Sequence, residues 1–111
     1  MEKLSIIALP QFEKELKQLA KKHTSIDKDF ERFLKEVSEN PFTGTKLGNN
    51  CFKVRMDIKS KRAGKRGGAR VITCVKLIST KLYLVSIFDK ADRESISKEE
   101  IDLILKKSGI I

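Results

Sequence analysis

The stretch ARVITCVKLISTKLYLVSIF, residues 69–88, decides the fold of this 111-residue chain. Ala69–Ile78 and Leu82–Phe88 are apolar runs rich in Val, Ile and Leu, and Ser79-Thr80-Lys81 forms a tight turn between them. Such runs on either side of a short polar turn predict a β-hairpin. Continuous apolar runs are typical of buried strands, so we expect this hairpin at the centre of a sheet.

The residues ahead of this hairpin alternate with the period of a strand. Between Phe52 and Lys59, apolar side chains at positions 52, 54, 56 and 58 alternate with charged ones. This pattern predicts a strand with one buried and one charged face. The connection Ser60–Gly68 holds three glycines and four cations, so we expect no regular structure there. We also expect a loop over Phe42–Asn50, ahead of the strand.

Helical spacing prevails in the N-terminal part of the chain. Leu4–Leu9 is a short apolar run that we expect to form a buried strand, after which a proline is well placed to begin a helix. Apolar stripes with helical spacing follow over Phe12–Ala20 and Ile26–Val37, and Asn40-Pro41 ends the second stripe. These stripes predict two antiparallel helices joined by a short polar turn.

The C-terminal segment carries the signals of a last helix. Ser97 with Glu100 three residues later forms a capping box, and Gly109 ends the helix. The element order is therefore β-α-α-β-β-β-α. We expect an α+β fold in which the helical hairpin packs on one face of a small, mostly antiparallel sheet of three or four strands. The length of the chain predicts a single domain over residues 1–111.

Composition indicates the environment of the protein. An apolar fraction of 40% is too high for intrinsic disorder, and no apolar run approaches the ~18 residues of a membrane helix. The two cysteines, Cys51 and Cys74, form no CxxC pair and provide no disulfide framework. We therefore expect a reduced, cytoplasmic protein without a membrane segment.

Positive charge is concentrated in one part of the sequence. Lysine and arginine number 24 against 15 acidic residues, which gives a net charge of +9. Between Lys46 and Arg70 there are nine cations and one acidic residue, Asp57, so this segment alone carries +8. Such a concentration is typical of a protein that binds a polyanion such as nucleic acid.

The residue types present exclude several kinds of catalytic site. His23 is the only histidine, and capping or solvent exposure at the end of the first helix explains it. Two cysteines and one distant histidine do not make a zinc site. Gly64-Lys65 lacks both the upstream glycine and the following Ser or Thr of a phosphate-binding loop. We therefore expect neither a metal ion nor another cofactor.

The remaining candidates are cations on neighbouring strands. Lys53 and Arg55 project from the same face of their strand, and Arg70 begins the next one. If these strands pair, the three side chains point to one patch that would hold a phosphate through charge and the fork of arginine. Lys90 and Arg93 follow the last apolar strand. The alternative is a solvated strand face whose charges prevent aggregation.

Short motifs along nearly the whole chain resemble those of a known family. They are the helical hairpin with Phe12, Asn40-Pro41 with Gly44 shortly after, Phe52-Lys53-Val54-Arg55, Gly64-Lys65-Arg66-Gly67-Gly68-Ala69-Arg70-Val71-Ile72 and Phe88-Asp89-Lys90. The stretch rich in glycine and cations is the most specific of them. Together the motifs closely resemble the RelE/ParE superfamily of bacterial toxins, and within it the RelE/HigB-type branch.

The resemblance implies a RelE-like fold and the toxin of a type II toxin–antitoxin pair. Toxins of this branch cut messenger RNA, commonly in the ribosomal A site, and stop translation. The ribose 2′-hydroxyl attacks the neighbouring phosphate without a metal and leaves a 2′,3′-cyclic phosphate and a 5′-hydroxyl. This chemistry needs a base, an acid and positive charge at the pentavalent phosphate.

Carried over by position, the resemblance implies four catalytic residues: Lys53, Arg55, Arg70 and Lys90. Arg70 would stabilise the phosphate, Lys53 would act as the base, and Lys90 would act as the acid or stabilise the leaving group. Further cations expected to bind RNA are Lys46, Lys61, Arg62, Lys65, Arg66 and Arg93. Some relatives place a tyrosine near the C-terminal end of the site, where this chain has Phe88. The ring keeps its stacking surface but provides no phenolic proton.

The resemblance also implies partners: an antitoxin from a neighbouring gene that covers the basic groove, mRNA and the 70S ribosome, and operator DNA bound by the toxin–antitoxin complex. Two other functions stay open. A ParE-type toxin shares the fold but poisons DNA gyrase, and a non-catalytic module would bind RNA or DNA through the same patch. An aromatic fraction of 6% disfavours the stacking platform of a single-strand binder.

Overall fold

The computed structural model describes residues 4–60 and 67–111, and within these ranges it contains five strands and three helices. In chain order they are β1 (Ser5–Ala8), α1 (Pro10–Lys22), α2 (Ile26–Glu39), β2 (Thr45–Gly48), β3 (Cys51–Met56), β4 (Ala69–Lys76), β5 (Lys81–Asp89) and α3 (Lys98–Lys107). The predicted α+β fold is confirmed. None of these helices has the length and apolar character needed to cross a membrane.

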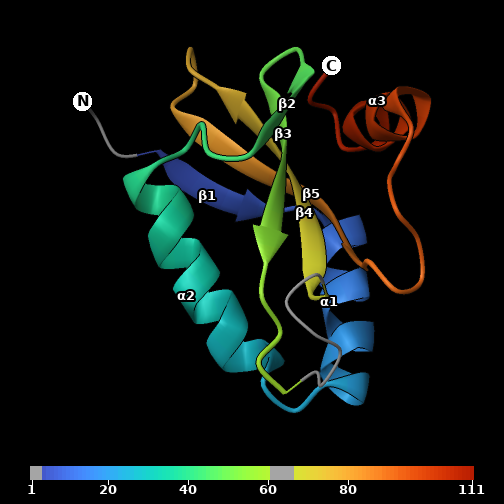
Figure 1. Ribbon diagram of the computed structural model, residues 1–111. Coiled ribbons are helices and arrows are strands. Elements are labelled where there is room, and N and C mark those ends of the chain that lie inside the picture. Colours follow the sequence, from blue (N-terminus) through green and yellow to red (C-terminus); the bar gives the residue numbers. More distant parts are fainter. Residues whose placement is uncertain (1–3, 61–66) are drawn as a thin grey trace.

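The strands form one sheet in the order β1-β5-β4-β3-β2. β4 and β5 are the predicted central hairpin, with Ala69 opposite Asp89. β3 pairs antiparallel with β4, and β1 pairs parallel with β5. Figure 1 shows β1 (blue) and the β2–β3 hairpin (green) on either side of this central pair. The sheet is therefore mostly antiparallel, as predicted.

The strand β2 corrects one prediction. Thr45–Gly48 lies in the segment predicted to be a loop, yet it pairs antiparallel with β3 and gives the sheet a fifth strand. Its sequence, TKLG, has little apolar pattern of its own, so pairing with β3 is what keeps it extended. Two predicted strands also end earlier than expected, at Met56 and Lys76, where the chain leaves the sheet.

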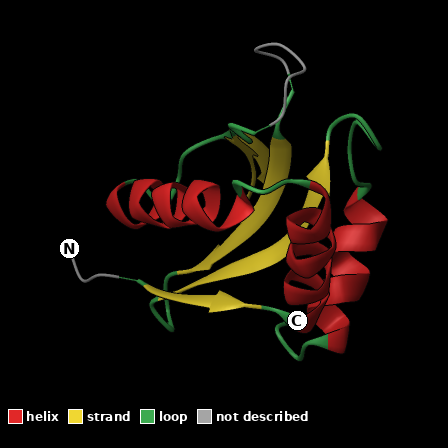
Figure 2. Ribbon diagram, turned by 90° about the horizontal axis from the view of Figure 1, so that it is seen from below, coloured by secondary structure: helices red, strands yellow, loops and turns green. Residues whose placement is uncertain are grey.

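Two apolar cores cover opposite faces of the sheet. The larger core joins α1 and α2 to one face, with the rings of Phe12 and Phe30 5.6 Å apart. The smaller core lies under α3 and includes Ile72, Phe88 and Leu105. Figure 2 shows the helices (red) against the twisted sheet (yellow). The helical hairpin packs on one face as predicted, and α3 occupies part of the other.

A buried carboxylate fixes the exit of β3 against α2. Asp29 is 1% exposed and pairs with Arg32. It accepts hydrogen bonds from the Ser25 hydroxyl (2.6 Å) and from the Lys59 backbone N–H (3.3 Å). Because a buried carboxylate is costly unless its oxygens are satisfied, these donors hold the segment after β3 against the start of α2.

β4 begins where two backbones come close. Gly68 has φ +86°, and a Cβ at this position would lie 2.8 Å from the Met56 carbonyl oxygen. Only glycine combines this left-handed backbone with so close an approach. The start of β4 thereby lies against the end of β3, which decides which side chains face each other there.

Candidate active site

Arg55 on β3 and Arg70 on β4 lie directly opposite each other. A backbone hydrogen bond from the Val75 N–H to the Asn50 carbonyl (2.9 Å) sets the alternation of this antiparallel ladder. Counted from that bond, the two arginines occupy a non-hydrogen-bonded position, where opposite Cα atoms are only about 4.5 Å apart. The structure therefore brings these two predicted residues together on one face of the sheet.

Lys53 lies one step along the same face of β3. It is opposite Ile72 on β4 and Thr45 on β2. Its side chain is half-buried, whereas Arg55 is exposed. Since side chains of a strand return to the same face every second residue, Lys53 and Arg55 are neighbours on this face.

β5 adds an aromatic ring to this face. Phe88 is opposite Arg70, so Arg70 lies between two strands that both contribute to the site. The Arg93 guanidinium lies over the Phe88 ring, 5.3 Å from its centroid. Arg93 also donates hydrogen bonds to the Glu100 carboxylate and to the Ser95 carbonyl, both 3.0 Å. Phe88 is 5% exposed, packs in the smaller core and is covered by Arg93, so its ring offers no open stacking surface in this structure.

Hydrogen bonds to Asp89 stabilise the turn that carries Lys90. The carbonyl and one carboxylate oxygen of Asp89 accept the N–H groups of residues 91–93, at 2.9–3.2 Å. At the end of α1, His23 Nε2 lies 3.1 Å from the other carboxylate oxygen. The Lys90 N–H donates to the Gly68 carbonyl (3.1 Å), so Lys90 lies beside the start of β4, near the two opposed arginines.

Asp89 and the His23 ring have a structural role that was not predicted from the sequence. His23 is the C-cap of α1, as expected, but its side chain is only 16% exposed and contacts Asp89. The motif Phe88-Asp89-Lys90 contains the signal, because it places an acidic residue directly after an apolar strand. Its partner, 66 residues away, has no signal in the sequence.

Asp57 only partly balances the positive charge of this face. Its Oδ1 lies 3.0 Å from Arg55 Nε, but the side chains are 72% and 47% exposed, so the ion pair is weak. Arg70 donates to the Ala69 carbonyl (3.2 Å). Like charges directly opposite each other destabilise a sheet, and an anion bound between them removes that cost. The arrangement therefore suits a phosphate group.

One other predicted RNA-binding cation, Lys46, does not join this face. Lys46 is opposite Phe52, whose ring lies in the larger core, so Lys46 is directed to the opposite face from Lys53. Tyr83 lies toward the far end of β5 from Phe88. Four further predicted residues lie outside the described ranges: Lys61, Arg62, Lys65 and Arg66.

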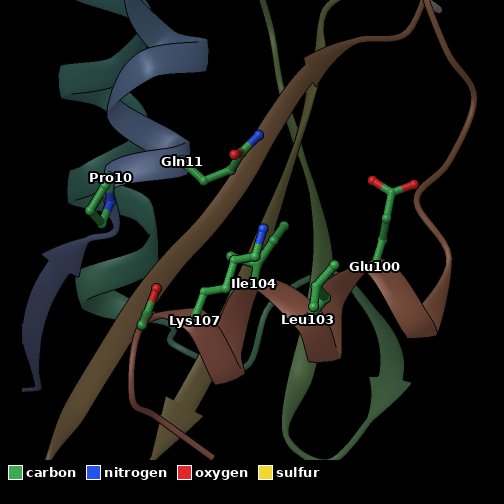
Figure 3. A pocket seen from close by; sticks show the side chains of 7 residues that line it. Pro10, Gln11, Glu100, Leu103, Ile104 and Lys107 are labelled. Carbon is green, nitrogen blue, oxygen red and sulfur yellow. The ribbon is translucent and has the colours of Figure 1, made fainter.

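A hollow beside α3 lies apart from the opposed arginines. Figure 3 shows it between the start of α1 and α3. Its lining is formed by Pro10, Gln11, Glu100, Leu103, Ile104, Lys107 and Ser108. Glu100 connects this hollow to Arg93, but neither Arg55 nor Arg70 lines it. The candidate site is therefore an open face of the sheet and not this hollow.

Comparisons with known proteins agree with the fold. A family model described as the RelE toxin of the RelE/RelB toxin–antitoxin system matches residues 12–111. The structure is similar to the Escherichia coli toxin RelE in the free state, solved as a variant with two arginines replaced by alanine. The TM-score is 0.63 at 16% identity, over 96% of this chain and 98% of that chain.

A second similar structure is a chain of the intact E. coli RelBE toxin–antitoxin complex. Its TM-score is 0.58 at 17% identity, and the match covers 76% of this chain and 93% of that chain. The comparison with curated proteins found no match. At these identities the two structures show that the fold is shared.

Proposed function

Since this chain belongs to the RelE toxin family, we propose that it is an endoribonuclease that cuts mRNA on the ribosome, without a metal ion, and stops translation. The observation that carries this proposal is the Arg55–Arg70 pair on an open face of the sheet. Neighbouring guanidinium groups offer several N–H donors to phosphate oxygens. If a phosphodiester is held between them, these fixed N–H donors would balance the negative charge that develops on the phosphate in the transition state.

The proposed reaction assigns a role to each neighbour of this pair. The 2′-hydroxyl loses its proton to Lys53 while its oxygen forms a bond to phosphorus. The bond from phosphorus to the 5′-oxygen breaks, and Lys90, beside the start of β4, donates a proton to that oxygen or stabilises its charge. The products are a 2′,3′-cyclic phosphate and a 5′-hydroxyl.

The ribosome is part of this proposal because no histidine serves the site as an acid or base. The only histidine of the sequence, His23, contacts Asp89 at the end of α1, and the one carboxylate described beside the arginines, Asp57, is paired with Arg55. Catalysis by lysines and arginines then depends on an RNA that is already held in line for attack, and such orientation contributes several orders of magnitude to a rate. A translating ribosome would supply it in the A site.

We also propose that an antitoxin covers the same face. One structure with this fold belongs to the E. coli RelBE toxin–antitoxin complex. The exposed cation Arg55 and its neighbour Arg70 favour an acidic segment as the partner, and opposite charges would make association fast. A segment bound there would exclude RNA, and the complex would reach operator DNA through the antitoxin.

A translation extract with a defined mRNA tests the ribonuclease proposal. The unmodified protein should cut the mRNA and stop protein synthesis. Arg70→Ala should lower the cleavage rate at least about 100-fold, because it removes a donor to the phosphate. Lys28→Ala, at an exposed lysine of α2, is the control and should behave like the unmodified protein. Unchanged cleavage by a folded Arg70→Ala variant would refute the assignment.

Two other results would favour the alternative functions. Covalent adducts between gyrase and DNA, without cut mRNA, would indicate a ParE-type toxin. Salt-sensitive RNA binding without any cleavage would indicate a passive binding module, since phosphate contacts weaken as salt rises.

A further inference from the structure

Cys51 and Cys74 lie directly opposite each other on β3 and β4. The hydrogen bond from the Val75 N–H to the Asn50 carbonyl flanks this pair and makes it a non-hydrogen-bonded one. At such positions the Cα atoms are about 4.5 Å apart and the side chains share one face of the sheet. That separation lies in the range that disulfides span, about 4.4–6.8 Å. The backbone is therefore already placed for a cross-strand disulfide.

The two thiols differ in acidity because they interact across the strands. The interaction with the Cys51 thiol lowers the pKa of the Cys74 thiol to about 7, against the opposing effect of burial, and Lys76 lowers it further. The same contact, together with burial, raises the pKa of Cys51 far above its ordinary value. Cys74 is thus the thiol that ionises near neutral pH, and the thiolate is the nucleophilic form.

Cys74 is buried but lines a hollow at the edge of the sheet. Cys51 and Cys74 are 4% and 3% exposed. A hollow lined by Cys74, Lys76 and Asp102 lies beside the fully exposed Ile78. A small reagent in this hollow would lie next to Cys74, between the carboxylate of Asp102 and the ammonium of Lys76, which donates to the Ile110 carbonyl (2.7 Å).

We propose that Cys51 and Cys74 form a reversible redox site that a low-molecular-weight disulfide such as oxidised glutathione converts into a cross-strand disulfide. The Cys74 thiolate attacks one sulfur of the reagent, and the reagent's S–S bond breaks to release one glutathione thiolate. Cys51 then gives up its proton and attacks the Cys74 sulfur, which expels the second glutathione. Two protein thiols are oxidised, and one disulfide is reduced to two thiols.

This site does not depend on the proposed ribonuclease function. Cys51 lies two residues before Lys53 on the same face of β3, under the part of the core that includes Leu105 of α3. A bond between Cys51 and Cys74 would therefore tie β3 to β4 in the register that places the opposed arginines together. Disulfides in reducing compartments are usually of this transient kind.

Mass spectrometry of the folded protein after treatment with oxidised glutathione tests the proposal. The monomer should lose two hydrogens and, after denaturation, accept no iodoacetamide, and dithiothreitol should restore both alkylation sites. Cys51→Ser should stop at one glutathione attached to Cys74, and Cys74→Ser should react at least tenfold more slowly. Two alkylatable thiols after oxidation, or a disulfide between two molecules, would overturn the proposal.

A second measurement needs no variant and so does not depend on how well serine is tolerated. The rate of Cys74 alkylation in the folded protein, followed by peptide mapping, should rise with pH and level off above a midpoint near 7, because the thiolate form is complete there. A rate that keeps rising to the ordinary thiol value of 9.0 would contradict the assigned order of attack.

Discussion

A double-mutant cycle on Arg55 and Arg70 measures whether their guanidinium groups share one face. The variants are Arg55→Gln, Arg70→Gln and the double variant, each unfolded with urea. Two like charges at a non-hydrogen-bonded position repel, so replacing Arg70 should cost less stability in the unmodified protein than in the Arg55→Gln background.

The size of this coupling follows from Coulomb's law. Two guanidinium groups would repel each other by about 0.6 kcal/mol if their centres were about 7 Å apart in the dielectric of water. Asp57 lies 3.0 Å from Arg55 and offsets part of it, so we expect a coupling free energy of about 0.5 kcal/mol. The cycle removes the separate effects of each substitution, such as the lost hydrogen bond from Arg70 to the Ala69 carbonyl.

Salt distinguishes repulsion from other kinds of coupling. The Debye length falls from about 30 Å at 0.01 M to about 3 Å at 1 M ionic strength, so the repulsive coupling should disappear in the high-salt titration. Phosphate at low ionic strength should also remove it, since a bound anion balances both charges. A coupling of zero at low salt, or a favourable one, would mean that Arg55 and Arg70 point apart and that the predicted phosphate site is not formed.

Two substitutions outside the site should lower the stability of the fold, one at a close backbone approach and one at a buried carboxylate. Gly68→Ala should lower the free energy of unfolding by about 1–3 kcal/mol, because the new Cβ would lie 2.8 Å from a carbonyl oxygen of β3. Gly48→Ala is the control and should lower it less, because nothing lies within 4 Å of a Cβ at that position. Equal losses of stability in urea unfolding would contradict the close approach at Gly68. Asp29→Asn should cost about 2–3 kcal/mol by weakening hydrogen bonds to a buried carboxylate. The exposed Asp27→Asn should be nearly neutral, and similar losses for both would be inconsistent with the role of Asp29.

The elements with a strong apolar period could be predicted from the sequence. The two helices and β3 expose and bury side chains at regular intervals, and the strands of the central hairpin are continuous apolar runs. The bounds predicted for these elements agree with the structure within a few residues. β2 could not be predicted, because Thr45–Gly48 is extended through its pairing with β3 and has no pattern of its own. The prediction of a loop over Phe42–Asn50 was wrong for that reason.

The candidate site could be predicted only as a set of residues. Alternation placed Lys53 and Arg55 on one face of a strand, but nothing in the sequence fixes which residue of β4 lies opposite each of them. The same unknown register concealed that Cys51 and Cys74 face each other. Lys46 was predicted to bind RNA from its positive charge alone. Its pairing with Phe52 on β3 directs its side chain to the other face of the sheet.

Buried polar contacts between distant segments were also beyond sequence reasoning. Asp29 accepts a hydrogen bond from residue 59, and His23 contacts Asp89, but a single polar residue in an apolar pattern does not reveal its partner. Such contacts depend on the tertiary structure, which local spacing does not encode.

In the proposed reaction, Arg55 and Arg70 hold a phosphodiester while the neighbouring 2′-hydroxyl attacks it. The chemical ends of the RNA fragments left on translating ribosomes reveal whether this reaction takes place. We expect a 2′,3′-cyclic phosphate on the upstream fragment, a 5′-hydroxyl on the downstream fragment, and neither product with Arg70→Gln. Fragments that begin with a 5′-phosphate, or the same fragments in undiminished yield from Arg70→Gln, would contradict it.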